Sequence, residues 1–141
     1  MYKFLTIALL NYKNEIKNLI EKINSQSSIP IIKHLDGICH IYIDNYADMD
    51  KAKKVLFNSK MRRPEICGAT ETLLIDQRIK DYALTLLQPL IEANCVIRCD
   101  KYIHSLHKNF VLASEQDWST EYLDKISVSY THLTLPTNRE V

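Results

Sequence analysis

The chain has 141 residues, a mass of 16.4 kDa and a formal net charge of +1, with 46% hydrophobic and 25% charged residues. This length suits one domain with its own core, and the near-neutral charge gives no general attraction to nucleic acid or anionic membranes. No apolar run approaches the ~20 residues that span a bilayer. Gly37 and Gly68 are the only glycines, so a glycine-rich nucleotide loop of the G-x-G-x-x-G or Walker type cannot be built.

Four cysteines are present, but a chain this rich in Ile, Leu and Val does not need disulfide staples. The first ten residues carry one lysine and a short apolar stretch, yet no small-residue cleavage site precedes the polar residues 11–14. A buried first element is therefore expected rather than a signal peptide. We expect a cytoplasmic protein with reduced thiols.

Taken in chain order, apolar spacing and turn residues predict helices and short strands in alternation. Helices are expected at residues 14–24, 48–60, 78–93 and 118–126, and strands at residues 29–32, 38–44, 71–76, 95–98 and 110–113. Asp48 is the expected N-cap of the second helix, with Lys51, Lys53, Lys54 and Lys60 on its solvated side. Pro89 is expected to kink or end the third helix. This alternation implies parallel β-α-β packing and an α/β fold.

The segment Val128–Thr137 continues none of these patterns. It back-translates to GTC TCT TAT ACA CAT CTG ACG CTG CCG ACG, which resembles a transposon-end adapter of short-read sequencing libraries read through into codons. We therefore expect residues 128–141 to be a non-native tail, leave them out of the predicted fold, and expect the natural protein to be longer.

Cys67 is the strongest single candidate for chemistry. It lies on a predicted loop beside Gly68, with Arg62 and Arg63 close in sequence. A thiolate is a nucleophile that nearby cations favour, a glycine neighbour leaves room for a substrate carbonyl, and an arginine pair can hold a phosphate. On spacing alone this signal is weak, because a lone cysteine is usually a small buried core residue.

A second set of residues leaves a different interpretation open. Zinc-binding residue types follow one another in the pattern C-x3-C-x4-H-x2-H, at Cys95, Cys99, His104 and His107. The central loop is much shorter than that of a zinc finger, and no glycine assists a turn. Core cysteines and surface histidines are the default reading, so we assign no metal. A small non-catalytic module that binds zinc remains the alternative.

Three longer stretches together resemble the γ-glutamyl phosphate reductase (glutamate-5-semialdehyde dehydrogenase) family of the aldehyde dehydrogenase superfamily. They are Ser28–Asp44, Asn58–Asp76 and Asp117–Asp124, in the family's order and separation, and the resemblance covers about residues 16–126. It implies part of an aldehyde dehydrogenase-like catalytic domain, a mostly parallel sheet with flanking helices that is incomplete in this chain.

The resemblance also implies a reaction. It places Cys67 on the family's catalytic cysteine, whose thiolate attacks γ-glutamyl phosphate, releases phosphate and leaves a thioester that NADPH reduces to glutamate 5-semialdehyde in proline biosynthesis. Arg62 and Arg63 are candidate phosphate-binding residues. The segment His34–Gly37 stands where hydrolytic relatives carry a water-activating glutamate, which suits a reductase that must not hydrolyse its thioester.

The same resemblance divides the chain into three parts: an unmatched segment at residues 1–15, a partial cysteine-bearing domain at 16–127, and the adapter-like tail at 128–141. The family's cofactor-binding domain lies mainly upstream of the match, so no cofactor-binding residue is assigned. The full-length enzyme is expected to be a homo-oligomer. The 141-residue chain alone is expected to be inactive, because catalysis needs both reactants held together.

Overall fold

The chain divides into two units, residues 1–36 and 37–141, and the computed structural model describes residues 18–30 and 37–133. In the first unit, residues 18–26 are helical, which confirms the described part of the first predicted helix. Its apolar residues Leu19 and Ile23 are at least half exposed. Ile29 and Pro30 form no strand. The rest of that predicted strand and the unmatched residues 1–15 lie outside the described residues.

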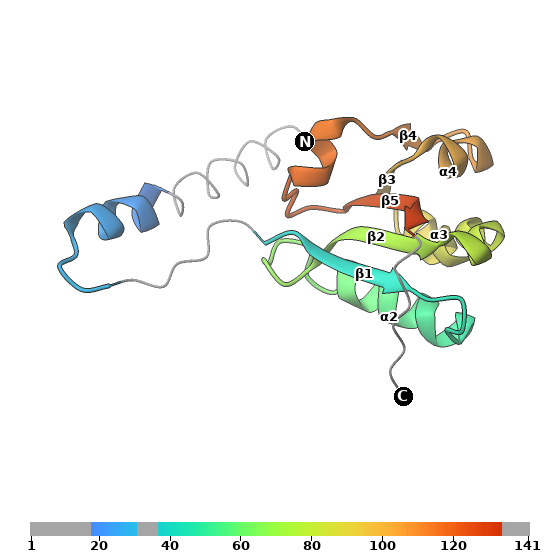
Figure 1. Cartoon of the computed structure of the whole chain (residues 1–141), viewed down its shortest axis with the longest axis horizontal. Helices are drawn as coiled ribbons and strands as arrows, with labels where there is room; N and C mark the ends of the chain where they lie inside the picture. Colours follow the sequence, from blue (N-terminus) through green and yellow to red (C-terminus); the bar gives the residue numbers. More distant parts are fainter. Residues whose placement is uncertain (1–17, 31–36, 134–141) are drawn as a thin grey trace. The chain divides into compact units, whose positions relative to one another are not determined.

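The second unit is built on a five-stranded sheet in the order β1-β2-β5-β3-β4, in which every strand pair is parallel (Figure 1). The predicted fold class, a mostly parallel sheet with flanking helices, is therefore confirmed. The strands are β1 (Cys39–Ile43), β2 (Thr70–Asp76), β3 (Val96–Cys99), β4 (Val111–Leu112) and β5 (Ile126–Leu133). The helices are α2 (Met49–Met61), η1 (Gln77–Tyr82), α3 (Ala83–Glu92), α4 (Lys101–Leu106) and η2 (Glu115–Ser119).

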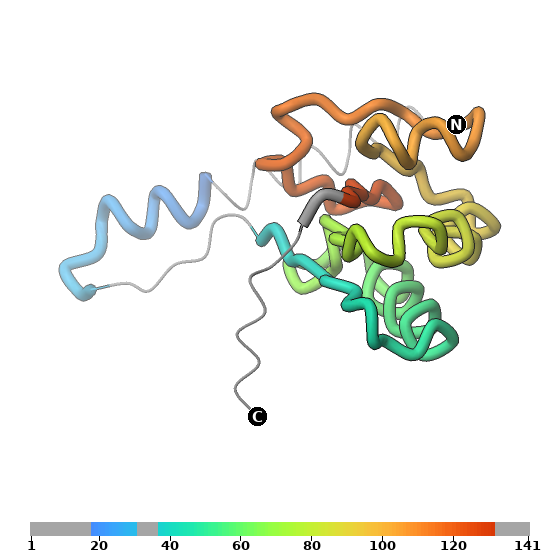
Figure 2. Tube along the Cα trace, turned by 45° about the vertical axis from the view of Figure 1, so that its right-hand side comes forward, coloured from blue at the N-terminus to red at the C-terminus, as the bar shows by residue number. Residues whose placement is uncertain are grey.

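The direction of the chain through the sheet decides which face each connection covers. From β1 to β4 the chain always moves toward the β4 edge, so right-handed crossovers put α2, α3 and α4 on one face. The return from β4 to β5 runs the other way and puts η2 on the opposite face. Figure 2 shows the η2 segment (orange) across β5 (red) from α2 (green).

The hydrophobic core lies between the sheet and its three α-helices. Alternate strand residues point into it, because successive side chains on a strand face opposite ways. The fully buried core members include Leu56, Leu73, Ile75, Leu86, Leu87, Leu90, Ile97 and Ile103. No helix within residues 18–30 and 37–133 has the length and apolar character that a bilayer crossing demands.

Several predicted elements are confirmed and others need correction. Asp48 caps α2 by accepting from the Lys51 N–H, as expected. Pro89 lies within α3 without ending it, and the helix continues to Glu92. The helix expected at 118–126 is wrong beyond Ser119: only the short η2 forms, and the following residues are irregular. Helix α4 was not predicted at all.

Lys60 is a further correction. It was assigned to the solvated side of its helix, but its side chain is fully buried. The helix register explains this, because Lys60 follows Leu56 by four residues and so shares its core-facing side.

Strand β5 occupies a position that was left empty in the predicted fold. Residues 128–133 belong to the expected non-native tail, yet they lie in the strand between β2 and β3. Paired residues share a face of the sheet, so Ser127 and Ser129 point toward the helices beside Ile97 and Leu73. Buried parallel strands usually read as continuous Val, Ile and Leu, whereas the helix-facing positions of β5 are Ser127, Ser129 and Thr131. Its polar sequence explains why no strand was predicted here.

Candidate functional site

The Cys67 loop joins the C-terminal end of α2 to the start of β2, at the edge of the sheet where the strands begin. Pro64 and Ala69 are buried and anchor the loop, and the Ala69 N–H donates to the Ile66 carbonyl at 2.9 Å. Cys67 between them is an exposed free thiol. A Cβ built on Gly68 would meet nothing within 4 Å, so space is open beside the thiol. The loop thus presents Cys67 to whatever binds at this edge.

Three segments far apart in sequence meet around this loop. The Cys39 thiol donates to the Cys67 carbonyl at 3.3 Å. The Gly37 N–H donates to Glu121 Oε1 at 3.0 Å, and the Leu123 N–H donates to Glu71 Oε1 at 3.1 Å. Each of the three stretches that carry the family resemblance therefore supplies one side of the same small region. Of the segment His34–Gly37, only Gly37 lies within the described residues.

A buried ion pair stands behind the loop. Lys60 Nζ lies 3.1 Å from Glu71 Oε2, and both side chains are 1% exposed. Burial raises the pKa of Glu71 above its ordinary value, and Lys60 opposes that rise. Sequence reasoning missed this pair, although both residues fall on core-facing positions: Lys60 follows Leu56 by four, and Glu71 precedes Leu73 by two.

The two candidate phosphate-binding residues lie where α2 gives way to the loop. Arg62 is the C-cap of α2, and both Arg62 and Arg63 are exposed. Among the residues that the structure describes, neither guanidinium forms a hydrogen bond or ion pair. Both side chains are available to an anion that approaches this edge of the sheet.

The residues of the zinc alternative are not brought together. Cys95 and Cys99 are four residues apart along an extended strand, which separates them by about 13 Å. Burial raises the pKa of Cys95 to about 11 and that of Cys99 to about 12, and the Cys99 thiol faces the Val111 carbonyl. His104 is exposed on α4, and His107 stacks on Phe110. Across the described residues, no three His, Cys, Asp or Glu side chains are grouped to hold a metal ion.

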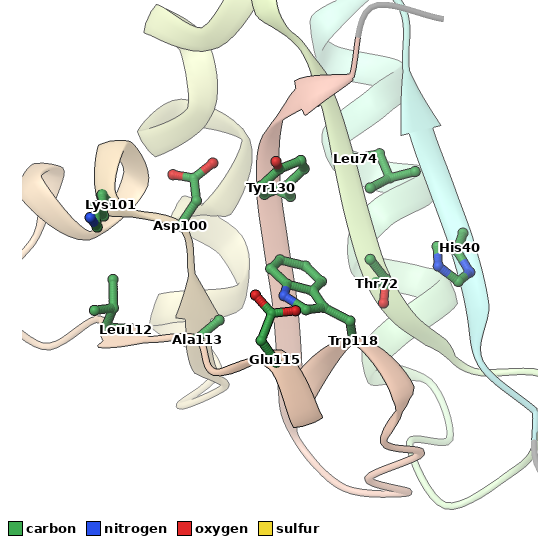
Figure 3. A pocket seen from close by; sticks show the side chains of 10 residues that line it. All are labelled: His40, Thr72, Leu74, Asp100, Lys101, Leu112, Ala113, Glu115, Trp118 and Tyr130. Carbon is green, nitrogen blue, oxygen red and sulfur yellow. The ribbon is translucent and has the colours of Figure 1, made fainter.

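A hollow of about 530 Å³ opens on the η2 face of the sheet, and sequence reasoning did not foresee it. Trp118, one of its lining residues, packs edge-on against Tyr130 at 5.1 Å between ring centroids (Figure 3). The Asp100 carboxylate at its rim is already engaged by Thr131 and by the Ile103 N–H. The lining residues are His40, Thr72, Leu74, Asp100, Lys101, Leu112, Ala113, Glu115, Trp118 and Tyr130. Cys67 is not among them.

A second network holds η2 and the residues after it to the sheet. Asp117 is buried and accepts from the Arg98 guanidinium at 3.2 Å and from the Tyr122 hydroxyl. Burial and the hydrogen bond to this carboxylate raise the pKa of Tyr122 to about 12. The network therefore anchors the residues just before Glu121 and Leu123, which make the hydrogen bonds near the Cys67 loop described above.

The described residues contain no Rossmann-type dinucleotide site. A Rossmann-type site has a glycine-rich turn that leads from a strand into a helix N-terminus. Gly37 and Gly68 are isolated, neither has a positive φ, and each precedes a strand instead of a helix.

Residues 37–133 thus form a parallel α/β sheet with an exposed cysteine on a loop at the edge where its strands begin. No family model matches the chain. It is 47% identical over 111 residues to a gamma-glutamyl phosphate reductase of Paramagnetospirillum magneticum, covering 78% of this chain and 26% of the relative. It is also 47% identical over 110 residues to that of Bartonella quintana, covering 78% and 27%.

A solved structure agrees with these sequence matches. The crystal structure of gamma-glutamyl phosphate reductase from Thermotoga maritima superposes with a TM-score of 0.74 and 32% identity, over 81% of this chain and 28% of that one. The chain thus corresponds in sequence and fold to a segment of gamma-glutamyl phosphate reductase. It spans about a quarter of the length of the curated relatives it matches.

Proposed function

We propose that this chain is the cysteine-bearing part of a reductase that converts γ-glutamyl phosphate to glutamate 5-semialdehyde, with Cys67 as the nucleophile. The observation that carries the proposal is an exposed thiol with open space beside it, on a loop at which three stretches similar to the reductases meet. The cytoplasm as location and a homo-oligomeric full-length enzyme remain predictions.

The chemistry assigned to this chain is acyl transfer. The Cys67 thiolate attacks the acyl carbon of γ-glutamyl phosphate, a carbon–sulfur bond forms, and the carbon–oxygen bond to phosphate breaks. Phosphate leaves with the bonding electron pair, and Arg62 and Arg63 are the candidate groups that neutralise its charge. The product on this chain is a thioester.

Reduction of that thioester requires a hydride donor, for which NADPH is the proposed cofactor. The described residues form no dinucleotide cradle, so we assign no part of its binding to this chain. We expect no NADPH oxidation by the 141-residue chain with an acyl phosphate, because the donor is not held against the thioester.

Acetyl phosphate is a suitable probe of the proposed half-reaction. Incubation with the 141-residue chain and site-resolved mass spectrometry should show acetylation of Cys67 about tenfold faster than that of Cys39, which is also exposed. Cys67→Ser should abolish the fast adduct and Cys39→Ser should leave it. Equal rates at the two thiols would contradict the assignment of Cys67.

We also propose that residues 128–141 are foreign to the enzyme, with residues 16–127 as the enzyme-derived part. The resemblance of the back-translated segment Val128–Thr137 to a sequencing adapter supports this proposal. Adapter-free amplification and sequencing of the native locus across codons 126–128 tests it. An unchanged reading frame through residue 141 in the genomic DNA would disprove it.

A further inference from the structure

The first residues of β2 break the regular pairing of the sheet. Cys39 pairs with Thr70, but the next residue of β1, His40, pairs with Thr72. Glu71 is thereby left without a partner on β1, as the extra residue of a bulge. Bulges bend a strand and re-aim its neighbours, and they are frequent beside active sites. This bulge lies four residues after Cys67, where the loop joins the sheet.

The side chain of Glu71 connects the two ends of the Cys67 loop. Its Oε2 accepts from Lys60 Nζ at the end of α2, and its Oε1 accepts from the Leu123 N–H, each at 3.1 Å. One carboxylate therefore ties together the helix before the loop, the strand after it and the segment around Leu123. Leu123 itself has a φ of 52°, a left-handed conformation that is unfavourable for a non-glycine residue.

Stability alone is a poor explanation for a buried ion pair. Removing two charges from water is costly, and well-packed apolar residues of similar volume often stabilise a protein as much or more. What apolar residues cannot supply is direction, because each hydrogen bond of the carboxylate fixes a distance and an angle. The hydrogen bonds of Glu71 therefore indicate that the ion pair positions the segments around it more than it stabilises the fold.

We propose that Glu71, held by Lys60, is a positioning residue that sets the Cys67 loop for acyl transfer. This inference rests on the proposed function of Cys67 as a nucleophile. Glu71 acts through the backbone of the loop and through the segment at Leu123, and it exchanges no proton with the substrate.

The decisive variant replaces both charges, as Lys60→Met with Glu71→Leu. It leaves no unpaired buried charge, so the 141-residue chain should fold with a thermal midpoint near that of the wild type. Acetylation of Cys67 by acetyl phosphate should nevertheless fall about tenfold or more, because the loop is no longer fixed. Glu71→Gln keeps one acceptor oxygen in place of two, so one of the two hydrogen bonds is lost, and its acetylation rate should fall between those of the wild type and the double variant.

Asp76→Asn is the matched control. Asp76 is a buried acid at the other end of the same strand, paired with Arg78 and Tyr42. Its loss should leave the acetylation rate of Cys67 unchanged. The buried thiols Cys95 and Cys99 report unfolding in the same spectra, since a purely structural role of the pair would expose them.

The outcomes separate the two hypotheses. Acetylation of Cys67 at the wild-type rate in the double variant would overturn the positioning role. If acetyl phosphate shows no preference for Cys67 in the wild type, the proposed function fails. Hydrogen exchange of the Ala69 amide then tests separately whether the ion pair fixes the Cys67 loop. That amide should exchange faster in the double variant and not in Asp76→Asn, and equal protection in all three proteins would overturn the inference.

Discussion

Two buried hydroxyl groups on β5 have no hydrogen-bond partner among the described residues, and replacing them should stabilise the fold. Ser127 and Ser129 are fully buried, and their Oγ atoms are unpaired. An unsatisfied buried polar group costs about 1–3 kcal/mol of stability. Changing serine to alanine removes that cost and loses only the dispersion contacts of one oxygen atom, at roughly 0.1–0.2 kcal/mol each.

We therefore expect Ser127→Ala and Ser129→Ala each to raise the free energy of unfolding by about 1 kcal/mol. For a domain near this size, 1 kcal/mol corresponds to a rise in thermal midpoint of about 4 °C. Urea unfolding followed by circular dichroism, together with a thermal melt, measures both quantities. In the double variant Ser127→Ala with Ser129→Ala, the two changes in unfolding free energy should add only if the two sites share no neighbouring side chain that repacks.

Thr131 is the matched control on the same face of the same strand. It is equally buried, but its hydroxyl donates to Asp100 Oδ2 at 2.7 Å. Thr131→Val keeps the shape and removes a hydrogen bond to a carboxylate, so it should destabilise the chain by about 1.5–3 kcal/mol. Opposite signs at Ser129 and Thr131 are the expected result. A loss of stability in Ser129→Ala would refute the reasoning, because the hydroxyl would then have a partner.

Three further predictions concern charge, thiols and metal. Arg78 holds the pKa of Asp76 well below its ordinary range, so Asp76 binds its proton more readily in the unfolded chain than in the folded one. The contribution of Asp76 to stability should therefore be lost as the pH falls below about 4. Asp76→Asn should flatten that part of the curve of unfolding free energy against pH. In alkylation at pH 8, Cys67 and Cys39 should react at least about tenfold faster than Cys95 and Cys99, whose pKa values of about 11 and 12 keep them protonated; equal rates at all four thiols in the folded chain would contradict this. Metal analysis of the purified chain should find no stoichiometric zinc, and zinc whose chelation unfolds the chain would support the alternative of a zinc-binding module.

Local signals in the sequence were sufficient for much of the fold. The strand at β1, the cap at Asp48 and the strand at β2 each depend on neighbouring residues, and all three predictions are confirmed. Strand β5 could not be predicted in this way. Its place between β2 and β3 is set by two partner strands from elsewhere in the chain, while its own serines and threonine signal no buried strand.

The candidate site shows the same limit. Cys67 could be singled out from its own neighbours, whereas the contacts of Glu71 with Lys60 and Leu123 join residues 11 and 52 positions apart. Charge misled the prediction for Lys60, because a lysine was assumed to face water. Its position four residues after a core leucine was the better guide, since helix register decides which way a side chain points.

The position of Cys67 after the C-terminal end of α2 makes the charges of nearby residues important for its reactivity. The loop follows the C-terminal end of α2, where the helix dipole places about half a negative charge. Lys60 is already paired with Glu71, so Arg62 and Arg63 are the nearby cations in sequence that remain to offset it. Replacing both as Arg62→Gln with Arg63→Gln should slow alkylation of Cys67 at pH 7 about two- to fivefold, the equivalent of the 0.3–1 kcal/mol typical of exposed charges at a helix end. The effect should shrink in high salt, which screens exposed charges. The control variant Lys51→Gln with Lys54→Gln makes the same change of charge on exposed residues nearer the start of α2, and it should leave the alkylation rate of Cys67 unaltered. An equal slowing in this control would show that the overall charge, and not the arginine pair, governs the alkylation rate.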